Sequence, residues 1–124
     1  METHDSLAKK DNLIKLINRL GENVGFVYDP VNIIFAGNSH EEVYPLISKR
    51  ILQVHVKDFI NRDNKREFVE PGKGIVPLEK IIGDLKNDNY GYYISVEWEK
   101  MWHPEIEEGD IILTKYLKYL RKLI

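Results

Sequence analysis

Helix-like and strand-like segments alternate along this chain, and that alternation constrains its fold more than any other feature. Leu13, Leu16, Ile17 and Leu20 recur at helical spacing before Gly21, which predicts a helix over residues 6–20. Further helices are predicted over 40–50, from Pro77 to the turn at Asn89, and over 110–124. Three segments rich in β-forming residues separate them, at 24–29, 51–58 and 92–99. Strands that alternate with helices favour a parallel sheet, so we predict an α/β fold.

The connections between these elements are less regular. Pro30 removes a backbone donor and disfavours helix at Asp29, so we expect the first strand to stop there and a loop to lead to Ser39. Pro45 is expected to kink the second helix or to shorten it from its front. A polar stretch at 61–70 follows the second strand.

One face of every predicted strand ends in an ionisable residue. Side chains alternate between the two faces of a strand. Asp29, His55 and Glu97 lie on the same face, each near the C-terminal end of its strand. Ligands bind at that edge of parallel α/β sheets. The opposite faces are apolar and suited to lie beneath helices; they carry Val24, Phe26 and Tyr28, then Leu52, Val54 and Val56, then Tyr92, Ile94 and Val96.

Each of the three ionisable residues also has a purely structural explanation. An Asp before Pro is common in turns, and a His on a strand is often a core residue. Glu97 is harder to explain, because a carboxylate among β-forming residues is costly to bury without a cation. Taken together, they predict an oxygen-rich site that suits Mn²⁺, Mg²⁺ or Co²⁺, and also Zn²⁺.

Composition excludes several other classes of protein. The chain has no cysteine, which excludes a disulfide scaffold and a thiolate metal site. A net charge of −2 provides no electrostatic footprint for nucleic acid or for an anionic membrane. We find no signal peptide and no apolar run long enough to span a bilayer, and we expect one cytoplasmic domain over 1–124.

Four motifs resemble a known family. The segments "ETH", "VGFVYDPVN", "RILQVHVKDF" and "EPGKGIVPLEKIIGDLKNDNYGYYISVEWEKMWHPE" are similar, in order and spacing, to the xylose-isomerase-like sugar phosphate isomerase/epimerase superfamily. The resemblance covers essentially the entire chain. It implies that residues 1–124 form about the C-terminal half of a (β/α)8 TIM barrel, with parallel strands that alternate with helices.

The resemblance also implies a set of functional residues. In that family two glutamates, an aspartate and a histidine hold one divalent metal, which matches Glu2, Asp29, His55 and Glu97 here. Glu2 and Glu97 are then the catalytic pair that moves a proton beside the carbonyl of a sugar, through an enediolate. His4 and Lys57 fall within the same motifs and are candidate substrate contacts; for Lys57 a solvated strand-end lysine is the equal alternative.

The chain departs from some relatives at one candidate substrate position. Asn32 stands where DNA-repair endonucleases of this fold, and many sugar epimerases, carry a histidine. The segment before "PGKG" also lacks the Asp-x-His pair of the repair enzymes. Both differences argue against a three-metal site and against DNA repair.

A complete barrel needs eight βα units and about 250 residues, whereas this chain contains three strands and begins where a fifth strand would end. Three parallel strands cannot close, so we expect the inward residues Val27 and Tyr93 to be exposed. We therefore expect a homodimer or a complementing N-terminal half to cover them. The alternative to an active isomerase or epimerase is a non-catalytic half barrel, or a subunit that needs a partner chain to complete its site.

Overall fold

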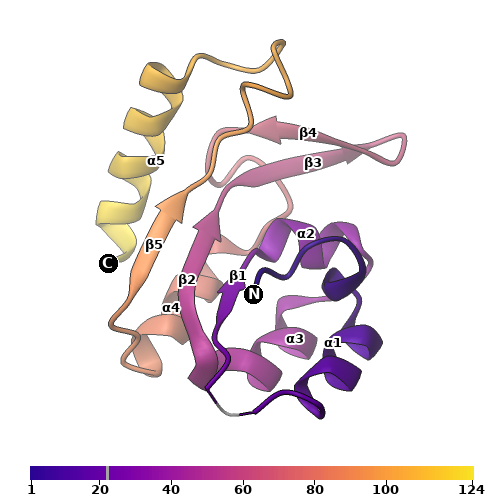
Figure 1. The fold of residues 1–124 in the computed structure, drawn as a ribbon. Coiled ribbons are helices and arrows are strands. Elements are labelled where there is room, and N and C mark those ends of the chain that lie inside the picture. Colours follow the sequence, from indigo (N-terminus) through magenta and orange to yellow (C-terminus); the bar gives the residue numbers. More distant parts are fainter. Residues whose placement is uncertain (22) are drawn as a thin grey trace.

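The computed structural model describes residues 1–21 and 23–124, and its centre is a parallel sheet of three strands. These are β1 (Phe26–Tyr28), β2 (Ile51–Val56) and β5 (Tyr93–Val96), with β2 in the middle. Both pairings are parallel, and the three arrows in Figure 1 point the same way. The predicted α/β architecture with a parallel sheet is therefore confirmed.

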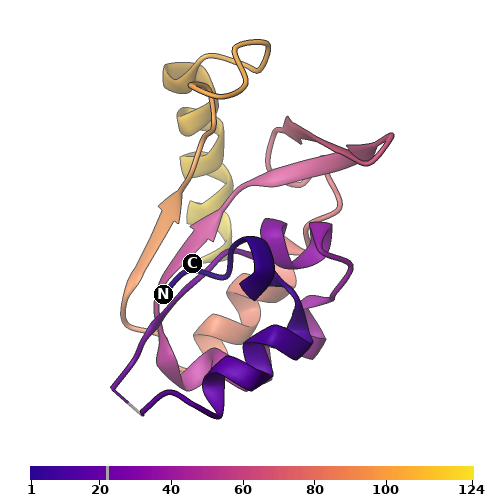
Figure 2. The ribbon, with the colours of Figure 1, turned by 45° about the vertical axis from the view of Figure 1, so that its right-hand side comes forward.

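Helices lie beside both edge strands of the sheet. They are α1 (Lys10–Ile17), α2 (Pro30–Phe35), α3 (His40–Ile47), α4 (Leu78–Asn87) and α5 (Gly109–Leu123), with 3-10 turns at Asp5–Ala8 and Ser48–Arg50. Figures 1 and 2 show α1, α2 and α3 grouped on the side of β1, and α5 along the side of β5. The predicted helix over 6–20 is thus divided at Lys9, whose backbone is extended.

The prediction of a loop from Pro30 to Ser39 is wrong, because α2 begins directly after β1. Asp29 caps this helix by accepting the backbone N–H of Asn32 at 3.2 Å, and Pro30 occupies the first helical position, which needs no N–H donor. Pro45 does not shorten α3 from its front either. That helix begins at His40, behind a capping box formed by Ser39 and Glu42.

The polar stretch at 61–70 belongs to a β-hairpin that the sequence prediction missed. Strands β3 (Asp58–Arg62) and β4 (Lys65–Val69) pair antiparallel through a two-residue turn. Asp63 and Asn64 form this turn with φ values of 50° and 59°, a left-handed conformation that Asp and Asn tolerate well. In Figure 1 the hairpin extends beyond the C-terminal end of β2.

Of the nine residues predicted on the apolar faces of the strands, four are buried, three are half-buried and two are exposed. Phe26, Tyr28, Val54 and Val56 lie in the core, whereas Leu52 is 48% exposed. Leu52 is skipped in the pairing of β1 with β2, since Phe26 pairs with Ile51 and Val27 with Gln53. This bulge breaks the expected alternation and places Ile51 in the core instead. Tyr92, which precedes the start of β5, is also exposed.

The inward face of the sheet is open at one strand and partly covered at another. Tyr93 on β5 is 78% exposed, as expected for an unclosed barrel. Val27 on β1 is half-buried, because Glu2 forms a parallel bridge beside it. Association with a second chain over this face stays a prediction. Within the described residues, none of the helices combines the length and apolar character needed to cross a bilayer.

A buried carboxylate connects the hairpin to the "PGKG" segment. Asp58 is fully buried and accepts the backbone N–H groups of Phe59, Gly72, Gly74 and Val76 at 2.9–3.1 Å. A side chain at Gly74 would collide with this carboxylate, so the loop passes close only because it has a glycine there. The hydroxyl group of Tyr116 on α5 accepts the backbone N–H of Asp58 at 2.7 Å. Asp58 thus holds the loop and α5 to the base of the hairpin.

We predict that Asp58→Ala lowers the free energy of unfolding by about 3 kcal/mol, because four backbone donors lose their acceptor. Urea denaturation measures this change. The control is Glu79→Ala in the exposed first turn of α4, which should change the free energy by no more than about 0.5 kcal/mol. Equal effects of the two substitutions would contradict the role given to Asp58.

Candidate metal centre

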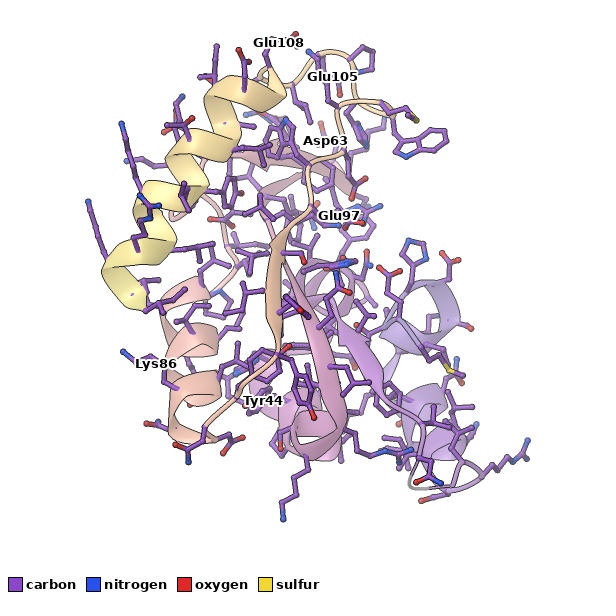
Figure 3. The ribbon with its side chains drawn as sticks, turned by 60° about the vertical axis from the view of Figure 1, so that its left-hand side comes forward. Tyr44, Asp63, Lys86, Glu97, Glu105 and Glu108 are labelled. Carbon is purple, nitrogen blue, oxygen red and sulfur yellow. The ribbon has the colours of Figure 1, made fainter. Side chains whose placement is uncertain are left out.

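Parallel pairing brings three predicted site residues to one edge of the sheet. Asp29 follows β1, His55 lies near the end of β2 and Glu97 follows β5, whose register pairs His55 with Ser95. The backbone N–H of Glu97 continues the ladder by donating to the carbonyl oxygen of Val56 at 3.3 Å. Figure 3 shows Glu97 just beyond β5, in the half of the molecule that also holds Asp63 at the hairpin turn.

Glu2 reaches the same edge from a short segment that runs beside β1. The backbone N–H of Val27 donates to the carbonyl oxygen of Met1 at 2.8 Å, and that of Thr3 donates to Val27 at 3.0 Å. Thr3 is fully buried, and its hydroxyl oxygen accepts the backbone N–H of Asp29 at 2.8 Å. Sequence reasoning missed Thr3, whose only signal was its place between two candidate residues.

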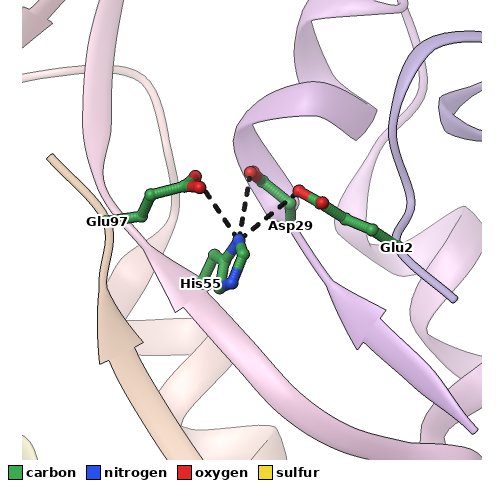
Figure 4. Close-up of side chains that lie close together, drawn as sticks. All are labelled: Glu2, Asp29, His55 and Glu97. Atoms are coloured by element: carbon green, nitrogen blue, oxygen red, sulfur yellow. Dashed lines mark ion pairs between the residues drawn. The ribbon is translucent and has the colours of Figure 1, made fainter. Parts of the chain in front are cut away.

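The four predicted metal ligands lie together. One ligand atom from each of Glu2, Asp29, His55 and Glu97 lies within 4.8 Å of all the others. The imidazole Nδ1 of His55 is 3.5 Å from Glu2 Oε1, 3.8 Å from Asp29 Oδ2 and 3.4 Å from Glu97 Oε2. In Figure 4 Glu2 and Glu97 approach this nitrogen from opposite sides, with Asp29 between them.

These residues fit a divalent cation. The Nδ1 atom of His55 and the Oδ2 atom of Asp29 are buried and form no hydrogen bond with any of the described residues. The separations from Nδ1 are long for hydrogen bonds, whereas ligand atoms about 2.1 Å from a shared ion lie roughly 3–3.5 Å apart. Buried polar atoms without a hydrogen bond are costly, and a common ion would coordinate both.

Lys57 is buried beneath this cluster, with 2% of its surface exposed. Its Nζ atom lies 2.9 Å from Asp29 Oδ2 and 2.8 Å from Glu99 Oε1, and it also forms an ion pair with Glu97. The contact with Asp29 is an ion pair without hydrogen-bond geometry, which leaves Oδ2 free to accept elsewhere. Lys57 is therefore not a solvated strand-end lysine. Sequence reasoning missed Glu99, although it shares the strand parity of Glu97.

Mutual attraction keeps these groups charged. Contacts with Asp29 and Glu97 raise the pKa of His55 to about 10. Burial alone would raise the pKa of Asp29, but His55 and Lys57 outweigh it and lower that pKa below its usual range. The contact with His55, followed by that with Lys57, lowers the pKa of Glu97 to about 2 against the effect of burial. Burial would lower the pKa of Lys57, but its carboxylate neighbours raise it.

Two adjoining pockets open at this edge, and together they hold the remaining candidates. The first has a volume of about 230 Å³ and is lined by Glu2, His4, Lys57, Glu97, Glu99 and Trp102. The second has a volume of about 160 Å³ and is lined by His4, Asp5, Ala8, Asn32, Phe35, Ala36 and Arg66. His4 belongs to both, while Asn32 lies only in the second. A larger hollow of about 400 Å³, between the hairpin and α5, does not include the cluster.

Comparisons with known proteins give this arrangement a context. The chain is 27% identical to inosose dehydratase of Clostridium perfringens, a match that covers 90% of this chain and 42% of that protein. It is 25% identical to inosose isomerase of Bacillus licheniformis, with 90% and 41% covered. The chain thus spans less than half the length of these curated relatives.

Solved structures agree on the fold. A xylose isomerase domain protein from Planctomyces limnophilus matches with a TM-score of 0.75 and 25% identity, over 98% of this chain and 43% of that one. The probable 3-DHS dehydratase AsbF of Bacillus anthracis, involved in petrobactin synthesis, matches with a TM-score of 0.80 and 19% identity, over 98% and 48%. The model of the xylose isomerase-like TIM barrel family matches residues 1–122. The chain therefore belongs to that family, and its fold is part of such a barrel.

Proposed function

We propose that this chain carries a divalent-metal site for proton transfer beside the carbonyl group of a sugar or related polyhydroxy ketone. The observation that supports it most is the cluster of Glu2, Asp29, His55 and Glu97, in which two buried ligand atoms have no hydrogen bond. One imidazole and three carboxylates suit Mn²⁺, Mg²⁺, Co²⁺ or Zn²⁺. When bound, such an ion acts as a Lewis acid toward a carbonyl oxygen.

In this proposal the two glutamates carry the proton. Glu2 and Glu97 stand on opposite sides of His55, and both line the first pocket, so a small substrate there lies between two carboxylates. One carboxylate removes the proton from the carbon beside the carbonyl, and the other returns a proton to the opposite face or to the neighbouring carbon. The buried ammonium group of Lys57 lines the same pocket and offsets negative charge that develops on the substrate oxygen.

The activities for which the relatives are named support this class of chemistry. Two curated relatives are named for a dehydration and an isomerisation of inosose. Both kinds of reaction can start with removal of a proton beside a carbonyl group. We therefore propose an inosose or a similar ketose as the first substrates to test.

We predict that the chain binds Mn²⁺, and that Glu97→Gln or His55→Gln weakens this binding by at least about 100-fold, because each removes a direct ligand. Calorimetric titration measures the affinity. The matched control is Glu99→Gln, which also loses a contact with Lys57 but lies outside the ligand cluster, and it should change the affinity less than about tenfold. Unchanged affinity in both ligand variants would rule out this metal site.

Metal binding should also release a proton. The pKa of His55 is raised to about 10 in the metal-free protein, so the imidazole is protonated at neutral pH and must lose its proton to become a ligand. We expect about one proton released per ion at pH 7, and an apparent affinity that rises about tenfold per pH unit from pH 6 to 8.

Calorimetry in two buffers of different ionisation enthalpy measures that proton. An unperturbed histidine, with a pKa of about 6.5, would already be mostly neutral at pH 7 and would release only a fraction of a proton. Binding of Mn²⁺ without proton release would therefore show that His55 does not carry the charge proposed for it.

Catalysis is tested by exchange of substrate protons with solvent. We predict that the Mn²⁺-loaded chain exchanges deuterium from D₂O into the carbon beside the carbonyl of inosose, followed by NMR. Glu2→Gln and Glu97→Gln should each slow this exchange by about 100-fold or more, because each removes one of the two proton carriers. The control is Glu70→Gln, which removes an exposed carboxylate paired with Lys115 and lies outside the ligand cluster. Metal binding without any exchange would favour the non-catalytic half barrel.

A further inference from the structure

The second pocket is lined by one arginine, Arg66. Across residues 1–21 and 23–124, no carboxylate forms an ion pair within 4.0 Å of the Arg66 guanidinium group, whereas Lys57 at the neighbouring cluster contacts three carboxylates. Arg66 instead lies over the rings of Phe35 and Phe68, at 5.1 and 5.7 Å from their centres. These aromatic contacts hold the guanidinium plane without neutralising it.

The neighbouring amide of Asn32 is also incompletely paired. Asn32 is 6% exposed, and its Oδ1 atom accepts a hydrogen bond from Arg66 at 2.7 Å. This contact fixes the orientation of the amide, so that its NH₂ group is directed away from Arg66. That Nδ2 atom is buried and has no hydrogen-bond partner in the part of the chain that the structure describes. The pocket is therefore lined by a residue with an unpaired amide group and by a guanidinium group that uses one of its five N–H donors.

This donor-rich pocket lies close to the metal centre. Lys57 Nζ and the Arg66 guanidinium carbon both lie within 6 Å of the centre of the Phe68 ring. The backbone N–H of Asn32 donates to Asp29, one of the candidate ligands. His4 lines both pockets. One small ligand can therefore contact the two sites together.

The two pockets differ in the groups they offer to such a ligand. The metal pocket is lined mainly by carboxylates, whereas the second pocket offers Arg66, Asn32 and His4. Its single carboxylate, Asp5, is 88% exposed and is already paired with His4 at 3.1 Å. A guanidinium fork matches the oxygens of a carboxylate or a phosphate, and it is strongest where no protein carboxylate competes.

We propose that Arg66 is a specificity-determining residue that binds an oxyanion of the substrate, a carboxylate or a phosphate, while the carbonyl end of the substrate lies at the metal centre. The placement of the carbonyl end at the metal centre rests on the proposed function. It restricts the substrate class from polyhydroxy ketones in general to those with a negatively charged substituent.

Three ligands of similar size test it on the Mg²⁺-loaded chain: ribose, ribonate and ribose 5-phosphate. We expect at least one anionic ligand to bind about tenfold or more tightly than ribose, with saturable NMR shifts at the Arg66 Nε–H and Asn32 side-chain amide. A preference for ribonate identifies a carboxylate, and a preference for ribose 5-phosphate identifies a phosphate. Equal affinities, or no saturable binding of either anion, would overturn the proposal.

Two variants separate Arg66 from other sources of affinity. Arg66→Met keeps an apolar stem against Phe35 and Phe68 and should abolish the anion preference while the affinity for Mn²⁺ stays unchanged. Asn32→Asp retains the arginine but supplies it with an internal carboxylate, and it should abolish the preference as well. The control is Arg62→Met, which removes an exposed arginine paired with Glu67 and should retain the preference.

An anion preference that persists in Arg66→Met would place the anion at the metal and overturn the proposal. Metal titration keeps the two hypotheses distinguishable. A chain that binds Mn²⁺ but does not discriminate among the three ligands overturns only the role of Arg66. A chain that prefers the anion through Arg66 but binds no metal overturns only the metal centre.

Discussion

Burial of negative charge is the constraint to which this end of the sheet is adapted. Parallel pairing directs side chains from three strands to one edge, where four carboxylates, from Glu2, Asp29, Glu97 and Glu99, surround Lys57 and His55. Lys57 offsets part of this charge, and a protonated His55 offsets a further part. An excess of acid remains, and the proposed divalent ion would offset it in exchange for the proton of His55.

Two fully buried aspartates show how the fold separates support from chemistry. The oxygens of Asp58 accept four backbone N–H groups, so none is available to a ligand. Asp29 uses Oδ1 to cap α2 and leaves Oδ2 without a hydrogen bond. Burial dominates at Asp58 and raises its pKa, whereas His55 and Lys57 lower that of Asp29. Both residues are equally buried, but only Asp29 has an oxygen directed into the site.

Sequence patterns predicted the convergence of the candidate site residues better than the structure around them. Strand parity is sufficient to predict that Asp29, His55 and Glu97 lie together, because the face on which each side chain lies depends only on alternation along its strand. Parity fails at Leu52, where a bulge changes the alternation. Sequence signals also fail at α2, because an Asp-Pro pair is compatible both with a strand end before a loop and with the cap and first residue of a helix. Glu2 came from family resemblance alone, since its bridge to β1 joins residues far apart in the chain.

The position of Arg66 was beyond sequence reasoning for a related physical reason. Its partner Asn32 lies on another element, and only the hairpin register decides which side chains of β4 face that helix. The same dependence on distant contacts applies to Glu2. The strands fix Asp29, His55 and Glu97, but Glu2 is held by hydrogen bonds from a short terminal segment to Gly25, Val27 and Asp29. Glu2 therefore keeps its place beside Asp29 only while these long-range hydrogen bonds hold, and Thr3 makes two of them, with Val27 and Asp29.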